Sequence, residues 1–356
     1  MVSELNRERP PATRGSPFDE HVLSRVETPV LTDRFVLRQA QDERGTYVTV
    51  ITPSKAKGKQ SQMNKMKETR AAVSILVGAT LLGSMGAWGR AIYHYEPNPM
   101  TVVTWRALIG AGALAVLLTI VRPQLLRVRP RDLAFFALYG FIGVTMNFWA
   151  YFSAVKFTTL AVAITLLYTY PVFVALLSAL FLGERLTGTK VGAILVTLVG
   201  SAFVAQIHQE EWFRLNLRGI LFGLVAGLSM AIYVIFGKRA LARYFPWTVV
   251  FYAFAAGGLF LAVMSGPRLL RAASYPTVAW LWIIGLALVP SLGGYALYTI
   301  GLRDLPASQA SIIATWEVVT AAFLGWLIFS EPLAPIQYLG AGLVCFGIGW
   351  IQRDKA

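Results

Sequence analysis

The sequence is poor in cysteine, histidine and charge, and each shortage excludes a class of function. Its 356 residues contain one cysteine and three histidines. The single cysteine, Cys345, cannot form an intramolecular disulfide, and neither residue type recurs at the spacing of a metal site, so we expect no metal and no other cofactor. Only 14% of the residues are charged, whereas 56% are hydrophobic. This balance indicates a chain that lies in a lipid bilayer.

Basic residues outnumber acidic ones, which gives a formal net charge of +14 at pH 7. In a soluble protein this excess would suggest nucleic acid. Here the basic residues lie mainly between apolar runs or in the N-terminal segment, without interleaved aromatic residues, so we predict no nucleic-acid partner. Residues 183–190 (GERLTGTK) resemble a phosphate-binding loop, but the lysine is one place late and no strand precedes it. With no catalytic constellation, we expect no catalytic residues and no enzyme.

About ten apolar runs account for most of the sequence. Lengths near 20 rather than near 10 favour helices over a barrel, because backbone groups in lipid must be paired within the segment. We therefore predict an all-α integral membrane protein with about ten transmembrane helices. The runs cover residues 71–92, 100–121, 133–153, 158–182, 191–205, 219–236, 247–264, 278–300, 307–329 and 336–350.

Alternate connections between these runs differ in basic residues. One set holds about three times as many as the other, and such residues favour the cytoplasmic side. We expect a multi-pass protein of the cell (inner) membrane with both termini in the cytoplasm. The richer set contains Lys65, Lys67, Arg70, Arg122, Arg127, Arg129, Arg131, Arg185, Lys190, Lys238, Arg239, Arg243, Arg303, Arg353 and Lys355.

The N-terminal segment, residues 1–65, is mixed in charge and contains no apolar run long enough to cross a membrane. We expect it to be disordered. A second interpretation is that translation starts at Met63 or Met66, immediately before a basic cluster.

The membrane part contains a degraded internal repeat. Residues 151–196 recur as residues 298–344, so that Tyr151 corresponds to Tyr298 and Glu184 to Glu331. Upstream, Ser84-Met85 recurs as Ser229-Met230. Such repeats indicate duplicated structural units.

Two repeats follow from this correspondence, residues 66–206 and 217–356, joined by a linker at residues 207–216. Each repeat holds five predicted helices. Because this number is odd, the second repeat enters the membrane upside down relative to the first. Inverted repeats are a recurring design of transporters, with the substrate site near the midplane between them.

The pattern YPVFVALLSALFLGERLT followed by GAILVTLVG resembles the EamA-type domain of the drug/metabolite transporter superfamily, and EVVTAAFLGWLIFSEPLAP is similar. Arg106 in TWRALIG matches an arginine often found early in the second helix of the first domain. The resemblance covers about residues 66–352 and implies ten helices in two inverted domains that carry small metabolites, usually outward. Val318 follows Glu317 where the family usually has proline, so we expect a straighter second broken helix.

Two ionisable residues lie within predicted spans, where a charge costs about 2.5 to 3.5 kcal/mol. Glu317 lies about 15 Å into its span, near the midplane. Arg106 lies in the outer half of the second span. In one interpretation Arg106 attracts a substrate carboxylate and Glu317 takes a proton or holds a cation. In the other, the two side chains pair with each other or with backbone and simply lock the repeats together.

Further candidates are a helix break and a group of polar or aromatic side chains. Pro171 frees the carbonyl of Leu167 near the midplane and either lines a cavity or produces a mere kink. The aromatic residues either wall a cavity for an amphipathic solute or pack and anchor the helices. Glu184 and Glu331 look like capping residues and only weakly like gates. The predicted substrate-binding residues are Arg106, Asn147, Trp149, Tyr168, Tyr170, Tyr295, Tyr298, Trp316 and Glu317.

These features favour a secondary carrier that exports a small amphipathic metabolite or an amino acid by alternating access. Its partners would be the small-molecule substrate, the bilayer and a proton as the exchanged ion. A passive facilitator or channel, a structural membrane protein and an intramembrane enzyme are the alternatives. The sequence does not indicate an oligomeric state.

Overall fold

The structure is a computed structural model that divides into two compact units, Met1–Met66 and Lys67–Ala356. Side chains are described from residue 61 onward. The predicted linker lies outside the described residues except for Asn216. The described residues are 30–32, 35–41, 47–53, 56–96, 98–206 and 216–353.

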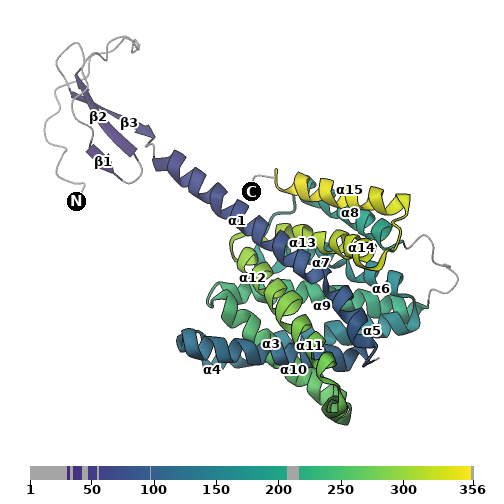
Figure 1. The fold of residues 1–356 in the computed structure, drawn as a ribbon. Coiled ribbons are helices and arrows are strands. Elements are labelled where there is room, and N and C mark those ends of the chain that lie inside the picture. The colour runs from purple at the N-terminus through teal and green to yellow at the C-terminus, as the bar shows by residue number, and fades with distance from the viewer. Residues whose placement is uncertain are drawn as a thin grey trace. The chain divides into compact units, whose positions relative to one another are not determined.

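In the first unit three antiparallel strands form a sheet in the order β1-β2-β3. The strands are β1 (Val30–Thr32), β2 (Phe35–Gln41) and β3 (Tyr47–Pro53), as Figure 1 shows. We expected residues 1–65 to be disordered or to precede the true start of translation; the described residues of this segment include these three strands. The reason is local, because β3 (YVTVITP) consists largely of β-branched residues, which favour strands. Helix α1 (Ala56–Gly83) also begins before residue 71, where we expected the first span.

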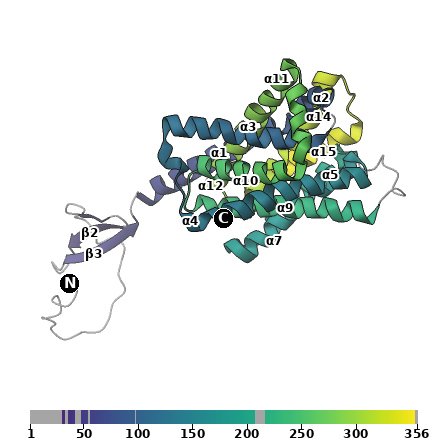
Figure 2. The same ribbon diagram turned by 90° about the horizontal axis from the view of Figure 1, so that it is seen from below.

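The second unit is a bundle of helices, shown from two directions in Figures 1 and 2. After α1 come α2 (Met85–Tyr93), α3 (Pro99–Val121), η2 (Pro123–Leu126), α4 (Pro130–Gly140), η3 (Phe141–Met146), α5 (Asn147–Phe157), α6 (Leu160–Leu167), α7 (Tyr170–Leu182) and α8 (Gly188–Val204). The second half contains α9 (Leu217–Leu241), α10 (Pro246–Ser265), η6 (Gly266–Ser274), α11 (Thr277–Leu286), η7 (Ala287–Gly293), α12 (Gly294–Asp304), α13 (Ala307–Ala314), α14 (Trp316–Phe329) and α15 (Pro335–Ile351).

Eight helical runs in the described residues are long and apolar enough to cross a membrane. They make the second unit a multi-pass, helical membrane domain. Helices α8 and α15 are shorter, with 17 residues each. They correspond to two of the shortest predicted spans, which is why the long runs number eight and not ten.

Corresponding helices of the two repeats pack against each other: α3 packs on α10, and α8 on α15. Figure 1 shows α8 and α15 side by side. Their approach is close at Gly200 and Gly340, where a Cβ on either glycine would lie 2.7 or 2.6 Å from the other's carbonyl oxygen. Only glycine permits such contact between backbones in the membrane. Helices α5 and α9 also pack together and lie side by side in Figure 2.

Both of the predicted broken helices are broken. In the first, Tyr168 and Thr169 interrupt the run between α6 and α7; in the second, Thr315 alone separates α13 from α14. The Thr169 hydroxyl donates to the Leu166 carbonyl at 2.7 Å and the Thr315 hydroxyl to that of Ile312 at 2.6 Å. The second break is therefore shorter, but it forms without the proline that marks the first.

Two π-helical segments, η3 and η7, occupy corresponding positions in the repeats. The pattern of apolar runs in the sequence did not predict them. In η7, Pro290 lies inside the helix and the Ser291 hydroxyl donates to the Leu286 carbonyl at 2.7 Å. A π segment turns the residues after it relative to a regular helix. The two segments thereby set the direction of Asn147, directly after η3, and Tyr295, two residues after η7.

The connections meet at two opposite faces of the bundle. Asp132, Glu184, Tyr244 and Asp304 line one cavity, at the end of the bundle that carries the richer set of basic residues. We call this end the basic face. Tyr93, Pro99, Val155 and Glu331 line a second cavity at the other end, which we call the opposite face.

Candidate functional site

A two-part chamber lies between the repeats on the side of the opposite face. Its parts have volumes of about 630 Å³ and about 570 Å³. The first part is lined by residues of both repeats, including Asn147, Tyr168 and Glu317. The residues that line both parts, and so make them one chamber, are Gly83, Met85, Gly86, Phe148, Tyr151, Leu160, Ile164 and Ala321.

Arg106 lies on α3, a helix whose first turn is capped by the Asn98 side chain. The arginine is 6% exposed and lines the second part of the chamber. Its Nη1 donates to the Met85 sulfur at 3.0 Å, and its guanidinium lies 4.6 Å from the centre of the Phe148 ring. A thioether and an aromatic face hold a cation in place without neutralising it. The guanidinium therefore keeps most of its charge and donors for another partner.

Glu317 lies in the first turn of α14, directly after the break at Thr315. Its neighbour Trp316 is held by a bond from Nε1 to the Thr80 hydroxyl at 3.0 Å, which fixes the start of the helix. The carboxylate lines the first part of the chamber. In the described part of the chain it has no hydrogen bond and no ion pair. The break thus presents a carboxylate at mid-bundle, with its oxygens free to accept.

The two charged side chains of the chamber do not pair with each other. Among the described residues, ion pairs within 4.0 Å join Arg90 to Glu331, Lys190 to Glu184 and Arg243 to Asp132. None of these pairs includes Arg106 or Glu317. A direct ion pair between these two side chains, one form of our alternative interpretation, is therefore not present among the described residues.

Asn147 follows the π segment η3 and is 6% exposed. Its Nδ2 donates to the Ala226 carbonyl of α9 at 2.8 Å, which ties the two repeats together. The side-chain carbonyl has no donor among the described residues. Asn147 lines the chamber beside Phe148. It can therefore accept one hydrogen bond from a bound solute.

Tyrosines supply the remaining polar atoms of the wall. Tyr168, Tyr170, Tyr295 and Tyr151 line the chamber. The Tyr170 hydroxyl donates to the Ser311 carbonyl at 3.0 Å, across the repeats. Within the described residues the other three hydroxyls make no hydrogen bond, so they are available to a solute.

The structure does not bring every predicted residue to the chamber. Trp149 is 36% exposed and packs edge to face on Phe222, so its ring lies on the outside of the bundle. Trp316 contacts Thr80 through its indole nitrogen, and Tyr298 is buried at 2% exposure. None of these three lines the chamber. Pro171 is buried in the first turn of α7, behind the wall that Tyr168 and Tyr170 form.

Several wall residues were not among our candidates. Met85 and Phe148 contact Arg106, while Met230 and Gln337 line the first part of the chamber. Both methionines belong to the repeated Ser-Met pair, Ser84-Met85 and Ser229-Met230, whose recurrence could have marked them as wall residues. Met85 follows a short break at Ser84, whose hydroxyl donates to the Leu81 carbonyl at 2.6 Å. Nothing in the sequence pattern marked Gln337.

The chamber is sealed on the side of the basic face. The Glu184 carboxylate accepts from the Ala307 amide at 2.5 Å and from the Ser308 amide at 3.3 Å, and from the Ser308 hydroxyl at 2.5 Å. These groups form the start of α13. Lys238 donates to three carbonyls at the end of α12, those of Leu302, Arg303 and Leu305, at 2.6 to 3.0 Å.

At the opposite face the corresponding carboxylate, Glu331, pairs with Arg90 at 2.7 Å. Both side chains are about half exposed, at 51% and 53%. Nearby, the Tyr275 hydroxyl donates to the Glu96 carboxylate, and burial followed by this contact raises the pKa of Tyr275. Among the described residues Glu331 caps no helix, and it lines the second part of the chamber at this face.

Comparison with known proteins agrees with this architecture. The model of the EamA-like transporter family matches residues 69–206 and 217–353. An uncharacterized transporter of Archaeoglobus fulgidus is 31% identical over 77% of this chain and 93% of its own length. A probable terminal-alkyne amino-acid exporter of Streptantibioticus cattleyicolor is 28% identical over 76% and 86%. The threonine/homoserine exporter of Escherichia coli is 29% identical over 66% and 76%.

A solved structure whose title reads only "Crystal structure of protein" has the same fold, with a TM-score of 0.65 at 17% identity over 79% of this chain and 96% of that one. The two family matches together cover most of the chain, and the relatives are named as transporters and exporters and not as enzymes. The chain therefore belongs to the EamA-like transporter family.

Proposed function

We propose that the protein is a secondary transporter that exports zwitterionic amino acids, or similar amphipathic metabolites, across the cell membrane by alternating access. The observation that carries this proposal is the chamber itself. It holds a buried arginine and a partly buried glutamate that do not pair, together with tyrosine hydroxyls that make no hydrogen bond among the described residues. A solute with one carboxylate and one ammonium would satisfy both.

The charge balance favours a zwitterion over a simple anion or cation. A buried charge without a partner is costly, and pairing recovers that cost only when both partners are present. A carboxylate can bind Arg106 in two parallel hydrogen bonds, and an ammonium can donate to Glu317. An anion would leave Glu317 unpaired, and a cation would leave Arg106 unpaired. The names of two relatives, both amino-acid exporters, support the same substrate class.

The transport cycle in this proposal uses two inverted five-helix repeats, with α8 and α15 as the fifth and tenth spans. Two contacts support it. Gln337 at the start of α15 donates to the Val204 carbonyl at the end of α8, at 3.0 Å. Gln309 at the start of α13 donates to the Ile351 carbonyl at the end of α15, at 3.2 Å. Each short helix would then run from one face to the other, and the basic face and both termini would be cytoplasmic.

Counterflow in proteoliposomes tests the carrier and its charge recognition. We expect saturable exchange of threonine, and a loss of about tenfold or more in Arg106→Ala because a hydrogen-bonded charge is removed. The methyl ester of threonine, which lacks the carboxylate charge, should lose much less. Arg218→Ala, an exposed arginine outside the chamber, is the matched control.

Two results would contradict the proposal. Equal losses for threonine and its ester in Arg106→Ala would exclude charge recognition by this residue. Flux that rises linearly with concentration and shows no counterflow would indicate a passive channel.

A further inference from the structure

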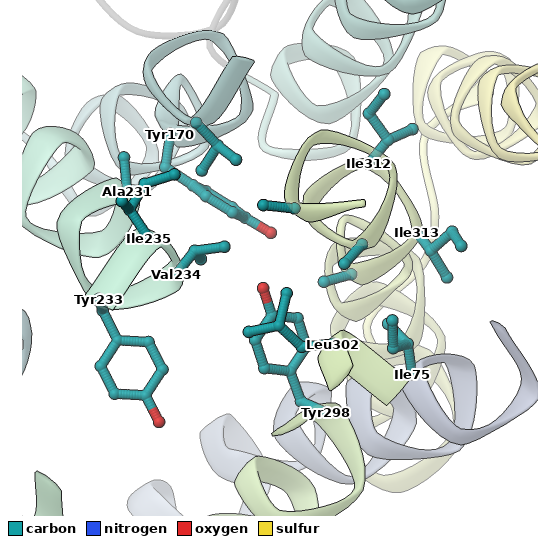
Figure 3. Close-up of a cluster of buried hydrophobic side chains, with 14 of the residues drawn as sticks. Ile75, Tyr170, Ala231, Tyr233, Val234, Ile235, Tyr298, Leu302, Ile312 and Ile313 are labelled. Atoms are coloured by element: carbon teal, nitrogen blue, oxygen red, sulfur yellow. The ribbon is translucent and has the colours of Figure 1, made fainter. Parts of the chain in front are cut away.

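A buried polar group lies between the chamber and the basic face. Tyr298 is 2% exposed, and its hydroxyl has no hydrogen bond in the described part of the chain. Figure 3 shows this hydroxyl pointing toward that of Tyr170, which belongs to the chamber wall. A buried hydroxyl without a partner costs free energy. In native proteins such groups are rare and call for a reason.

The internal repeat suggests why the Tyr298 hydroxyl is buried without a partner. Tyr298 corresponds to Tyr151, which lines both parts of the open chamber. The same position is therefore cavity wall in one repeat and sealed core in the other. If the bundle exchanges the conformations of its two repeats, Tyr298 becomes wall and gains its partner from water or substrate.

The seal above Tyr298 depends on Glu184. Its side chain is 13% exposed, accepts from two amides and one hydroxyl at the start of α13, and lies 3.8 Å from the Lys190 ammonium. Beyond it, at the basic face, is a vestibule of about 830 Å³ lined by polar residues that include Asp132, Glu184 and Lys238. This carboxylate lines the vestibule and holds the start of α13 in place.

The corresponding cap is not formed at the opposite face. If the two repeats had the same contacts, Glu331 would cap α6 as Glu184 caps α13. The first two amides of α6, those of Leu160 and Ala161, donate to no such carboxylate and have no partner among the described residues. Glu331 and Leu160 both line the second part of the chamber, on different helices. Their approach would close it.

We infer that Glu184 and Glu331 are exchanging latches, and that the sealed core from Tyr170 past Tyr298 to the vestibule is the second half of the substrate route. When Glu184 releases the start of α13, this half opens to the basic face. Glu331 then leaves Arg90 and caps α6, which closes the chamber at the opposite face. This inference rests on the alternating access of the proposed function, and it adds the residues that hold each state.

Cysteine accessibility tests the latches without any substrate. In a Cys345→Ser background, Thr299→Cys reports the sealed half, because Thr299 follows Tyr298 and is 2% exposed. Ala321→Cys reports the open chamber, whose two parts it lines. The protein is placed in lipid nanodiscs, so that a water-soluble maleimide reaches both faces. Labelling rates are then compared between variants.

Glu184→Gln should raise the labelling rate of Thr299→Cys by about tenfold or more and lower that of Ala321→Cys, since charge-assisted bonds hold the seal. Glu331→Gln, the matched control in the other repeat, should change both rates in the opposite direction. Ser308→Ala removes one bond from the other side of the seal and should act like Glu184→Gln but more weakly. This variant keeps the test open if Glu184→Gln does not fold.

Unchanged labelling of Thr299→Cys in both Glu184→Gln and Ser308→Ala would overturn the inference. The same shift in Glu184→Gln and Glu331→Gln would also overturn it. Failure of the proposed function looks different, because it appears in counterflow with threonine and leaves these labelling rates as they are.

Discussion

Arg106 and Glu317 show how charged residues can lie inside the bundle and still be available to a ligand. Met85 and Phe148 contact the guanidinium without offering it a negative charge. The break before α14 places Glu317 in the first turn of the helix, where its carboxylate accepts no hydrogen bond from the described residues. Each residue is therefore held in place but left chemically unsatisfied. Packing alone does not favour this state, whereas a ligand with two charges does.

The pH dependence of transport tests Glu317. If its carboxylate exchanges a proton or binds the substrate ammonium, the pH dependence of transport reflects its titration. Glu317→Gln keeps the shape of the side chain but cannot titrate, so its pH profile should flatten. The measurement is initial exchange rate against pH in proteoliposomes.

Glu68→Gln is the control for this experiment, because Glu68 is an exposed carboxylate on α1. Its profile should match that of the unchanged protein. A wild-type profile in Glu317→Gln would exclude a role for this carboxylate in titration.

The sequence was sufficient to predict the residues that are unusual in lipid, but not the residues that support them. Arg106 and Glu317 stood out because charge inside an apolar run is costly. Met85 and Gln337 did not, because a methionine or glutamine at a helix end is ordinary. Trp149 faces outward although its depth matches the chamber, since depth along a run does not determine which side of the helix a residue occupies.

Among the elements, the broken helices and π segments shape the chamber most. The sequence predicted the first break through Pro171, but the second forms with only Thr315 and its hydrogen bond to Ile312. The π segments could not be predicted from apolar runs, because an extra residue in one turn leaves the composition unchanged. Only the packing of the two repeats reveals them.

Val318→Pro tests whether the backbone at the second break can accommodate proline without a loss of stability. Val318 corresponds to Pro171 and lies in the first turn of α14, where its amide makes only a 3.1 Å bond to the Thr315 carbonyl. We expect stability within about 1 kcal/mol of the unchanged protein, because proline is tolerated in a first turn. Phe323→Pro, in the middle of the same helix, should cost about 3 kcal/mol or more.

Thermal unfolding of the purified protein in detergent measures both variants. A loss in Val318→Pro as large as that in Phe323→Pro would show that α14 is continuous through Thr315.

The contact between α8 and α15 gives a second prediction for elements. A Cβ on Gly340 would lie 2.6 Å from the Gly200 carbonyl, whereas one on Gly342, in the same helix, meets no atom within 4 Å. Gly340→Ala should therefore push the helices apart and lower the unfolding temperature. Gly342→Ala should be neutral or stabilising by up to about 1 kcal/mol, because alanine favours helix. Equal stability of the two variants would contradict close packing at Gly340.

Across the whole molecule, the two repeats share a design but are in different states. Glu184 caps a helix while Glu331 is half exposed, and Tyr298 is buried while Tyr151 lines the chamber. The sequence predicted the duplication because corresponding residues remain recognisable at a constant spacing. It could not predict this asymmetry, because the sequences of the two repeats are similar and do not indicate which repeat forms the open side.

The topology prediction follows from the odd number of spans in each proposed repeat. Thr189 lies at the start of α8 and Pro335 at the start of α15, which are corresponding helices of the two repeats. Inversion places Thr189 on the basic face and Pro335 on the opposite face, although each helix has only 17 residues. In a Cys345→Ser background, an impermeant maleimide added to intact cells should therefore label Pro335→Cys and leave Thr189→Cys unlabelled until the membrane is opened. If both cysteines react from the same side, one of the short helices does not cross the membrane and the repeats are not inverted. Glu184 and Glu331 would then not lie at opposite faces, and they could not act as exchanging latches.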